Sequence, residues 1–437
     1  MSEIVKPSTL PGFMELLPKD QILFNEMMDT IRKNFENHGF LPIDTPVIER
    51  SEVLLAKGGG ETEKQIYRFQ KGDTDMSLRF DLTVPLARYT VEHFNDLSFP
   101  FRRYHIGKVY RGEKAQKGRF REFYQCDIDT IGNEKLDISN DAEFPVVIYH
   151  TFKDLGFDEF AVKINNRKVL KGFFSYLGIE DSANVLRTVD KIDKIGQESV
   201  LQELIEEGIG EENADKILDF ILIEGTNDEI FAKLESLNIE NEIFEEGFEE
   251  LKTVIEYIKD YDIPEANYKV DLKIARGLDY YTGTVYETIL DNYPEIGSVC
   301  SGGRYENLAS YYTERKLPGV GLSIGLSRLY YQLTQAKIVE AKKQSLIDLI
   351  VIPMDEYIHE GIRLVSKLRK KGVKSIAYTE KSKLGKKFKY ADALEIPYTI
   401  VVGEDEVKSN KYTLKNMKSG EQDLFDVDEI VEKLSKI

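Results

Sequence analysis

The chain contains 437 residues, which is too long for one ordinary domain and suits two or three. Hydrophobic residues make up 41% and charged residues 31%, which is typical of a globular protein rather than a disordered or fibrous one. No apolar run approaches the ~20 residues that cross a bilayer, and residues 1–11 lack the pattern of a secretory signal. We therefore expect a cytoplasmic protein without membrane association.

The formal net charge of −18 is concentrated in one segment. Residues 191–260 contain 21 acidic and 6 basic residues, whereas residues 341–437 contain 19 basic and 16 acidic ones. Because local fields decide where a polyanion docks, the acidic total does not exclude a nucleic-acid partner.

Two cysteines, Cys126 and Cys300, are too few for a disulfide framework, and no Cys-x-x-Cys spacing indicates structural zinc. We expect both thiols to be reduced and partly buried. The sequence predicts no metal-binding residues.

The first part of the chain mixes helices with strands. Apolar spacing predicts a helix over residues 19–37 that ends at His38-Gly39, followed by an extended segment over 40–47 that Pro42 and Pro46 interrupt. The other expected elements here are strands over 76–84, 101–111, 119–131 and 159–164 and a helix over 140–155.

The pattern changes at about residue 167. Residues 167–264 are rich in acidic, amphipathic helical segments, such as 212–223 and 245–261, and we interpret them as an inserted helical module. Glycine-punctuated strands return over 268–324, and a helix is expected over 325–336.

The C-terminal part of the sequence is expected to form a separate small domain. A polar connector over residues 337–344, expected to be helical, precedes it. Strands are expected over 345–352, 373–378 and 398–402, and helices over 355–371 and 385–394. This alternation is typical of an α/β domain with a largely parallel sheet.

Polar side chains occupy one face of the expected strand over residues 119–131. Side chains alternate between faces with period two, so the apolar set Phe120, Tyr124, Cys126 and Ile128 lies opposite Arg119, Arg121, Phe123, Gln125, Asp127 and Asp129. The expected strand over 76–84 likewise sets Arg79, Asp81 and Thr83 opposite Leu78, Phe80 and Leu82.

Either strand alone is compatible with a solvated sheet face, because carboxylates are rarely buried without a partner. Two such strands, together with glycine-rich turns, favour a binding floor. Carboxylates and a glutamine suit a ligand that carries an ammonium group and a hydrogen-bonding side chain.

Five arginines complement this floor at expected strand ends, turns and a first helical turn: Arg111, Arg119, Arg121, Arg276 and Arg328. A single arginine is usually part of a surface ion pair. The planar guanidinium donates hydrogen bonds in pairs and stays charged, so five of them beside glycine turns indicate phosphate binding.

Three other patterns do not indicate sites. His105-Ile106-Gly107 lies inside an expected strand, and packing explains it. Gly319, Gly321 and Gly325 lack dinucleotide-binding spacing, and there is no Gly-Lys-Ser/Thr phosphate loop. The lysine run over 381–389 is interpreted as a solvated face, with contact to a nucleic-acid backbone as the alternative.

Four segments together resemble the histidyl-tRNA synthetases, which are class II enzymes: YRGEKAQKGRFREFYQCDID (110–129), ARGLDYYTG (275–283), SGGRYENL (301–308) and PGVGLSIGLSRL (318–329). The segment around Pro46 resembles the class motif of the dimer interface. Arg111 to Phe123 resembles the second class motif and Gly325 to Arg328 the third, while the run from Arg276 to Tyr281 is specific to the histidine enzymes and their paralogues. LGKKFKYADALEIPYTIVVGEDE (384–406) is similar to the family's anticodon-binding module.

The resemblance implies an α+β fold: an antiparallel-sheet catalytic domain with a helical insertion, plus a C-terminal α/β anticodon-binding domain. The implied boundaries are residues 1–166 and 265–336 for the catalytic domain, 167–264 for the insertion and 345–437 for the anticodon-binding domain. A homodimer is implied as well.

The resemblance also implies roles at an ATP site. Arg111 is expected at the α-phosphate, and Arg119 with Arg328 at the terminal phosphates. Phe123 and Arg328 are expected to sandwich the adenine, and Glu113 to help read its edge.

For L-histidine, the resemblance assigns Asp81, Thr83 and Gln125 to the ammonium group, and Asp129 with Tyr281 to the imidazole, where an acceptor and a hydroxyl satisfy both ring nitrogens. Tyr280, Gly302 and Gly303 complete the pocket, the glycines by letting backbone approach the ligand.

The implied reaction has two steps. The histidine carboxylate attacks the α-phosphorus of ATP and pyrophosphate leaves with Mg²⁺; the terminal ribose of tRNA(His) then takes the histidyl group from the adenylate. No protein base is needed, so catalysis is positioning and charge stabilisation, with Arg276 and Arg111 as the catalytic residues.

Some positions depart from the family pattern. Asp81 and Asp129 stand where some members carry glutamate, and Ser327 stands where many have glutamate. The main alternative function is the regulatory paralogue of histidine biosynthesis, a binding subunit that does not aminoacylate. That paralogue is expected to lack the C-terminal domain and parts of the catalytic set, all of which this chain has.

Overall fold

A computed structural model describes residues 4–56, 61–114, 118–180, 182–275 and 281–435. Two compact units divide the chain: Met1–Met14 with Met28–Ala336, and Glu15–Met27 with Lys337–Ile437. A long helix, α1 (Pro18–Asn37), matches the one expected from apolar spacing. Each unit is described below by itself.

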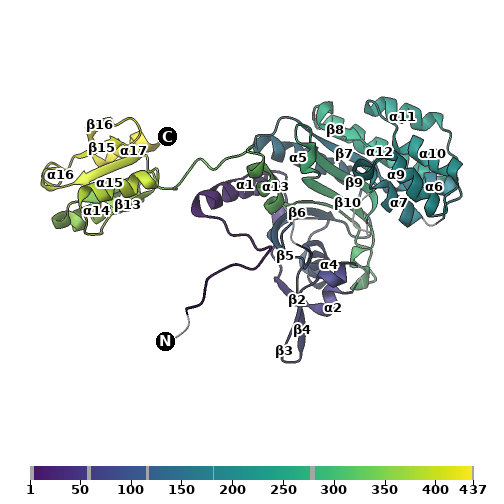
Figure 1. The fold of residues 1–437 in the computed structure, drawn as a ribbon, viewed down its shortest axis with the longest axis horizontal. Coiled ribbons are helices and arrows are strands. Elements are labelled where there is room, and N and C mark those ends of the chain that lie inside the picture. Colours follow the sequence, from purple (N-terminus) through teal and green to yellow (C-terminus); the bar gives the residue numbers. More distant parts are fainter. Residues whose placement is uncertain (1–3, 57–60, 115–117, 181, 276–280, 436–437) are drawn as a thin grey trace. The chain divides into compact units, whose positions relative to one another are not determined.

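The first unit is built around an eight-stranded sheet in the order β1-β5-β6-β11-β10-β9-β7-β8 (Figure 1). Its strands are β1 (Leu41–Pro42), β5 (Phe101–Tyr110), β6 (Glu122–Ile131), β7 (Phe160–Asn166), β8 (Tyr268–Val270), β9 (Tyr281–Leu290), β10 (Cys300–Tyr305) and β11 (Gly319–Ile324). The six central strands from β5 to β7 pair antiparallel, and only the short outer strands β1 and β8 pair parallel. The expected antiparallel catalytic sheet is therefore confirmed.

Helices cover this sheet with apolar side chains. From α5 (Ser139–Asp154), Phe144 stacks on Tyr286 of β9 with ring centroids 6.3 Å apart, and Phe152 lies 5.5 Å from Phe160 of β7. All four rings are buried and form part of the apolar core between α5 and the sheet. The helix α13 (Leu326–Gln335) follows β11 and packs near β6.

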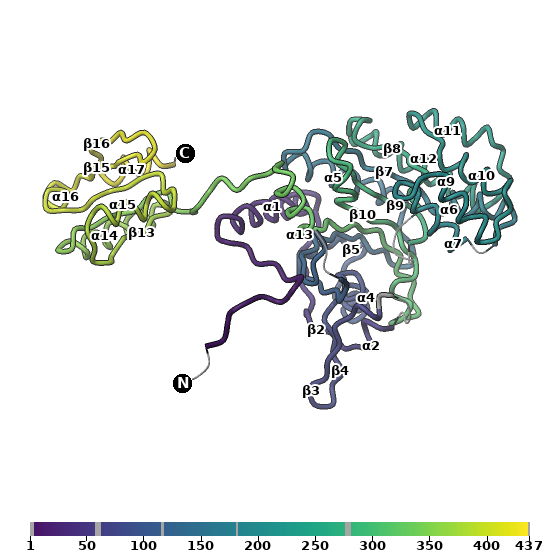
Figure 2. The backbone as a smooth tube through the Cα atoms, in the orientation of Figure 1, coloured from purple at the N-terminus to yellow at the C-terminus, as the bar shows by residue number. Residues whose placement is uncertain are grey.

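A three-stranded antiparallel sheet, β2-β4-β3, forms with β2 (Ile48–Arg50), β3 (Arg68–Lys71) and β4 (Thr74–Leu78), and the β3–β4 hairpin projects from the rest of the unit (Figure 2). The short helices α2 (Ser51–Leu54) and α3 (Glu61–Gln65) lie between these strands in sequence. The expected strand over residues 76–84 is wrong beyond Leu78, because α4 (Thr83–Glu92) begins at Thr83. The Asp81 side chain accepts a hydrogen bond from the Val84 amide at 3.0 Å. This aspartate therefore caps the start of α4 and is not part of a strand.

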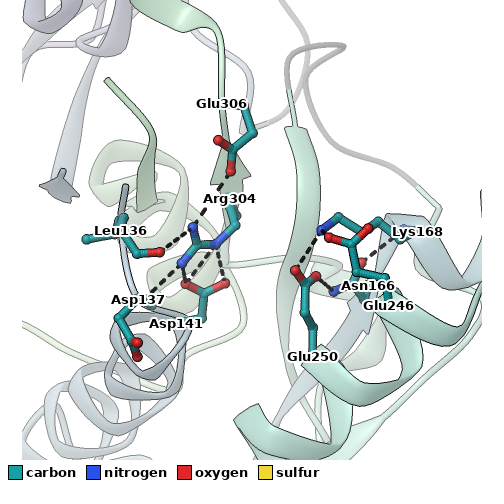
Figure 3. A network of polar contacts seen from close by, with 9 residues as sticks. All are labelled: Leu136, Asp137, Asp141, Asn166, Lys168, Glu246, Glu250, Arg304 and Glu306. Atoms are coloured by element: carbon teal, nitrogen blue, oxygen red, sulfur yellow. Dashed lines mark hydrogen bonds and ion pairs between the residues drawn. The ribbon is translucent and has the colours of Figure 1, made fainter. Parts of the chain in front are cut away.

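Residues between β7 and β8 are helical, as the charge and spacing predicted. The helices are α6 (Arg167–Tyr176), α7 (Ser182–Val189), α8 (Ile192–Ile195), α9 (Gln197–Glu206), α10 (Glu211–Ile221), α11 (Asn227–Ser236) and α12 (Glu242–Asp260). The first and last pack closely: a Cβ on Gly172 of α6 would lie 2.3 Å from the Phe244 amide nitrogen of α12. Glu250 of α12 also accepts hydrogen bonds from Asn166 and Lys168 at 2.7 and 2.6 Å (Figure 3).

A buried ion pair joins β10 to α5. The Arg304 guanidinium donates to both carboxylate oxygens of Asp141, at 2.7 to 3.1 Å, and to the carbonyl oxygens of Leu136 and Asp137 (Figure 3). Arg304 is 6% exposed and Asp141 0%, so neither charge is left to water. The pair fixes β10 and its glycines on the helix layer.

The second unit has a five-stranded sheet in the order β13-β12-β14-β15-β16. Its strands are β12 (Leu349–Pro353), β13 (Ser375–Ala377), β14 (Tyr398–Val402), β15 (Tyr412–Asn416) and β16 (Gln422–Phe425), and its helices are α14 (Ile358–Lys370), α15 (Leu384–Ala393), α16 (Glu404–Ser409) and α17 (Val427–Ser435). The expected α/β domain is confirmed, although the sheet is mixed, because β14, β15 and β16 pair antiparallel. The connector over residues 337–344 is irregular rather than helical, so that expectation is wrong.

The lysine run over residues 381–389 is not uniformly solvated. Lys387 is 2% exposed, and its ammonium donates to the Pro353 carbonyl oxygen at 2.9 Å and to Asp355 at 3.2 Å. Cys126 and Cys300 are both free thiols, as expected, and both are fully buried rather than partly buried. No helix within the described parts of the chain is both long and apolar enough to span a bilayer.

Candidate active site

A cavity of about 560 Å³ lies over one face of the large sheet, a size suited to a small-molecule ligand. The loop before α4, strands β6, β9, β10 and β11, and α13 all contribute side chains to it. The expected site residues that line it are Asp81, Thr83, Arg111, Glu113, Arg119, Phe123, Gln125, Asp129, Tyr281, Gly302 and Arg328. Residues from five separate segments of the sequence thus meet in one cavity.

One end of the cavity is basic. The Arg111 guanidinium carbon lies 4.3 Å from the Phe80 ring centre and 5.1 Å from that of Phe123, within cation–π range of both rings. Arg119 is half-exposed and lies 3.6 Å from Glu113, and Arg328 donates to the Ile296 carbonyl oxygen at 3.3 Å. Three guanidiniums around one opening suit a polyphosphate.

Arg121, the fourth basic residue of the prediction, does not line the cavity. Its Nε donates to the Glu113 carbonyl oxygen at 3.1 Å, and its backbone amide donates to the Gly12 carbonyl oxygen. It therefore holds the loop that carries Glu113. The segment 276–280, with the expected Arg276 and Tyr280, lies outside the described residues.

The opposite end is acidic and sits on β6, where the predicted period-two alternation holds. Phe123, Gln125, Asp127 and Asp129 all face the cavity. Burial raises the pKa of Asp127 to about 7 and that of Asp129 to about 6, although the nearby Arg103 guanidinium lowers both. Burial also raises the pKa of Asp81, against hydrogen bonds from backbone amides and the Arg111 charge.

Two buried acceptors in this acidic end have no donor among the described residues. They are Oε1 of Gln125 and Oδ1 of Asp127. The Gln125 amide is oriented by its Nε2, which donates to the Ser323 hydroxyl at 2.7 Å. Since buried polar atoms are nearly always paired, these acceptors indicate a ligand that brings donors, such as an ammonium group.

The two predicted pocket glycines lie on β10, but only Gly302 lines the cavity. A Cβ on Gly302 would lie 2.2 Å from the Gly321 carbonyl oxygen, so only glycine fits there. Gly303 lies against β9, where a Cβ would meet the Thr284 carbonyl oxygen at 2.7 Å and the Tyr281 ring at 3.0 Å. Gly303 therefore allows β10 and β9 to pack closely.

Several cavity residues were not assigned a role from the sequence: Asp127, Tyr286, Glu287, Ser301, Tyr305, Gly321 and Ser323. Strand register explains most of them, because Asp127, Ser323, Ser301 and Glu287 form one row across β6, β11, β10 and β9. The sequence placed Asp127 on the polar face of its strand without giving it a role. The other residues could be placed in the cavity only once the order of the strands was known, and a single sequence does not give that order.

An antiparallel sheet that carries guanidiniums at one end of a cavity and carboxylates at the other, with a separate mixed-sheet unit after it, defines a class II aminoacyl-tRNA synthetase. The family model described as "Histidyl-tRNA synthetase" matches residues 12–329, and the one described as "Anticodon binding domain" matches residues 348–437. The chain belongs to the histidyl-tRNA synthetase family, as its motifs predicted.

Known relatives agree along nearly the whole chain. The histidine–tRNA ligase of Clostridium tetani is 61% identical over 98% of both chains, and that of Finegoldia magna is 52% identical over 99% of this chain and all of that one. The crystal structure of histidyl-tRNA synthetase from a Nostoc species matches with a TM-score of 0.92 and 41% identity, covering 99% of this chain and 100% of that one. These similarities extend through both units.

A further solved structure is described as an ATP phosphoribosyltransferase regulatory subunit/histidyl-tRNA synthetase from Bacillus halodurans. Its TM-score is 0.74 at 20% identity, over 89% of this chain and 97% of that one. At that identity the likeness concerns the fold alone. The regulatory alternative is therefore less well supported than the ligase.

Proposed function

We propose that the chain activates L-histidine with ATP to form histidyl-adenylate and then transfers the histidyl group to the 3′-terminal adenosine of tRNA(His). Family membership supports the reaction class, and the cavity supports the substrates. The observation that carries the amino-acid assignment is the acidic end, where buried acceptors on Gln125 and Asp127 lie beside the Asp129 carboxylate. A ligand with both an ammonium group and a ring N–H matches those acceptors.

ATP is assigned to the basic end. Arg111 contacts the α-phosphate, while Arg119 and Arg328 contact the terminal phosphates, because their guanidiniums line the same opening. Phe123 and Arg328 sandwich the adenine, and Glu113 reads its edge. The aromatic faces that already flank Arg111 support this assignment, since they hold the cation without neutralising it.

Histidine is assigned to the acidic end. Asp81, Thr83 and Gln125 receive the ammonium group, and Asp129 with Tyr281 binds the imidazole, with the backbone of Gly302 alongside. All six line the cavity. Tyr280, Arg276 and Gly303 complete the assigned set by resemblance to the family motifs.

In the activation step the histidine carboxylate attacks the α-phosphorus in line and pyrophosphate leaves. A carboxylate is already a nucleophile at neutral pH, so the protein supplies orientation and stabilises the charge that develops on the phosphate, through Arg111 and Arg276. The terminal ribose hydroxyl of tRNA attacks the adenylate in the second step.

Mg²⁺ is proposed as the companion of the ATP substrate. The Glu113 and Glu287 carboxylates line the cavity that holds the proposed phosphate site, and Mg²⁺ prefers carboxylate and phosphate oxygens. The ion would neutralise charge on the leaving pyrophosphate. Among the described residues no group of three or more His, Cys, Asp or Glu side chains is arranged to bind a metal by itself.

We also propose a homodimer. Apolar side chains around Pro46 are exposed in the single chain: Leu41 is 61% exposed, Ile48 47% and Val47 36%. β1 is an edge strand, paired only with β5 among the described residues. A second copy would cover both the apolar side chains and the strand edge.

The proposed domain assignment keeps residues 1–166 with 265–336 as the catalytic domain, 167–264 as the insertion and 345–437 as the anticodon-binding domain. The compact unit that includes Lys337–Ile437 supports a separable tRNA-binding module. Because its substrates are those of translation, the protein is proposed to act in the cytoplasm.

One experiment tests the amino-acid assignment: ATP–pyrophosphate exchange with each of the twenty amino acids. We expect exchange with histidine alone at physiological concentrations. Exchange with a different amino acid, and none with histidine, contradicts the proposal and leaves the class II fold untouched.

A second experiment tests the tRNA module. Deletion of residues 345–437 should leave histidine-dependent pyrophosphate exchange within about threefold of the full chain, while the rate of tRNA charging falls by at least one to two orders of magnitude. Equal loss of both activities contradicts separate modules.

A further inference from the structure

The Asp129 carboxylate is held on two sides by buried residues outside the sequence assignments. Arg103 on β5 lies directly opposite Asp129 on β6 in the strand register, and its guanidinium forms an ion pair with Oδ2. The Tyr305 hydroxyl on β10 donates to Oδ1 at 2.9 Å. Arg103 is 0% exposed and Tyr305 2%, so both contacts are shielded from water.

Two glycines of β11 make room for this arrangement. Gly321 is the register partner of Asp129, and a Cβ there would lie 2.0 Å from Oδ1 of the carboxylate. A Cβ on Gly319 would lie 2.5 Å from the Tyr305 ring. The absence of side chains at these two positions therefore leaves room for the Asp129 carboxylate and the Tyr305 ring that donates to it.

Among the described residues, the Arg103 side chain contacts a cavity-lining side chain at Asp129. Asp129 lines the cavity, whereas Arg103 is not among the described residues that do so. Its remaining contact is weak: Nη1 donates to the Asp127 carbonyl oxygen at 3.3 Å, and Nε has no partner within the described residues. A guanidinium with a purely architectural role would be expected to use more of its donors, as Arg304 does.

The charges around Asp129 make a counter-ion necessary. The titratable and charged groups that face it or its neighbours are Arg103, His105 and Arg111 of β5 and its end, Asp127 of β6, Asp81 before α4, Tyr281 and Glu287 of β9, and Tyr305 of β10. Burial, together with the Arg103 and Arg79 charges, lowers the pKa of His105, against the neighbouring Asp44 carboxylate. The Arg103 charge opposes the effect of burial on Asp81, Asp127 and Asp129; it is the largest opposing influence on Asp127 and Asp129, whereas for Asp81 the Arg111 charge is larger.

We propose that Arg103 is a positioning residue for histidine recognition: it fixes the Asp129 carboxylate and keeps it ionised, so that the carboxylate accepts the N–H of the substrate imidazole. This inference rests on the proposed function, because it needs histidine at the acidic end. Tyr305 sets the orientation of the carboxylate, and Arg103 sets its charge.

The test uses the full chain with Arg103→Met, Arg103→Lys, Asp129→Asn and the double variant Arg103→Met/Asp129→Asn. Histidine KM, ATP KM and kcat of pyrophosphate exchange are measured from pH 6 to 9, with the thermal transition of each variant recorded alongside. Arg103→Met should raise histidine KM roughly 10- to 100-fold at pH 7.5, the scale of a lost charged hydrogen bond, and leave ATP KM within about threefold.

The pH profile separates a charge effect from a packing effect. Without the guanidinium the pKa of Asp129 rises, so the acidic limb of kcat/KM for histidine should move upward by about one unit or more in Arg103→Met. Arg103→Lys restores the positive charge and should return that limb to within about half a unit of the parent. If Arg103→Met is too unstable to assay, this lysine variant still tests the charge, because it must keep the parent profile.

The double variant tests whether Arg103 acts through Asp129. In the Asp129→Asn background, Arg103→Met should change histidine KM by less than about threefold, because the group it positions is gone. An undiminished effect there, an unchanged histidine KM in Arg103→Met, or a shifted acidic limb in Arg103→Lys overturns the inference. Absence of histidine-dependent exchange in the parent protein would instead contradict the proposed function.

Discussion

Two buried arginine–aspartate pairs have their arginines on strands of the same sheet and have opposite surroundings. Arg304 and Asp141 satisfy each other completely, with further bonds from Arg304 to two carbonyl oxygens (Figure 3). Arg103 and Asp129 are also buried, yet Asp129 faces a cavity, and within the described residues Nε of Arg103 and the neighbouring acceptors on Gln125 and Asp127 have no hydrogen-bond partner. Burial alone therefore does not separate a structural pair from a binding pair. The two kinds of pair differ in whether protein groups satisfy all the hydrogen-bond donors and acceptors of the pair and its neighbours.

The largest effect is expected on breaking the structural pair. Arg304→Met leaves the Asp141 carboxylate buried without a counter-ion, which should cost about 3–5 kcal/mol of unfolding free energy. Urea unfolding of the full chain measures this loss. Histidine KM of the protein that remains folded should stay within about threefold.

Arg315→Met is the matched control for that experiment. Arg315 is exposed and lies over the Phe94 ring at 4.2 Å, so its replacement should cost less than about 1 kcal/mol. Equal destabilisation by the two variants would show that the buried pair adds nothing to stability.

Gly321→Ala should disturb the Arg103–Asp129 pair by moving the Asp129 carboxylate. The added Cβ would lie 2.0 Å from Oδ1 of Asp129, so the carboxylate must move, and histidine KM should rise roughly 10- to 100-fold with ATP KM little changed. Steady-state pyrophosphate exchange provides both constants. Gly385→Ala, which meets nothing within 4 Å, is the control and should behave as the parent.

The smallest effect is a pH dependence. The pKa of Asp129 is raised to about 6 by burial, so the ionised carboxylate that accepts the imidazole N–H is lost as pH falls through that value. Histidine KM should therefore rise as pH falls, by up to about tenfold per unit below pH 6, while ATP KM changes little. Asp129→Asn is the control, because the imidazole of free histidine and the Asp127 and Asp81 carboxylates still titrate in it while position 129 does not. An identical profile in both proteins contradicts the role of Asp129.

The sequence predicted the elements whose periodicity is local. The alternation in β6 placed Gln125, Asp127 and Asp129 on one face, and the structure has them there, because every second side chain of a strand points the same way. The same reasoning failed for residues 79–84. Asp81 is polar because it binds the first amides of α4, and a helix cap looks like strand alternation over so few residues.

The remaining features depend on register and long-range packing. Arg103 contacts Asp129 because β5 and β6 pair in one particular register. Tyr305 contacts Asp129 because Gly319 and Gly321 of β11, which lie against the Tyr305 ring and the Asp129 carboxylate, have no side chains. Likewise, Lys387 is buried under Pro353 although its neighbours in sequence are lysines. Neither composition nor local spacing carries this information.

The most direct test of the account is a crystal structure of the protein with histidine and a non-hydrolysable ATP analogue. We expect an imidazole nitrogen within about 3.2 Å of the Asp129 carboxylate, the ammonium group beside Gln125, and the α-phosphate against Arg111. An imidazole bound away from Asp129, with the acidic end filled only by water, would contradict it.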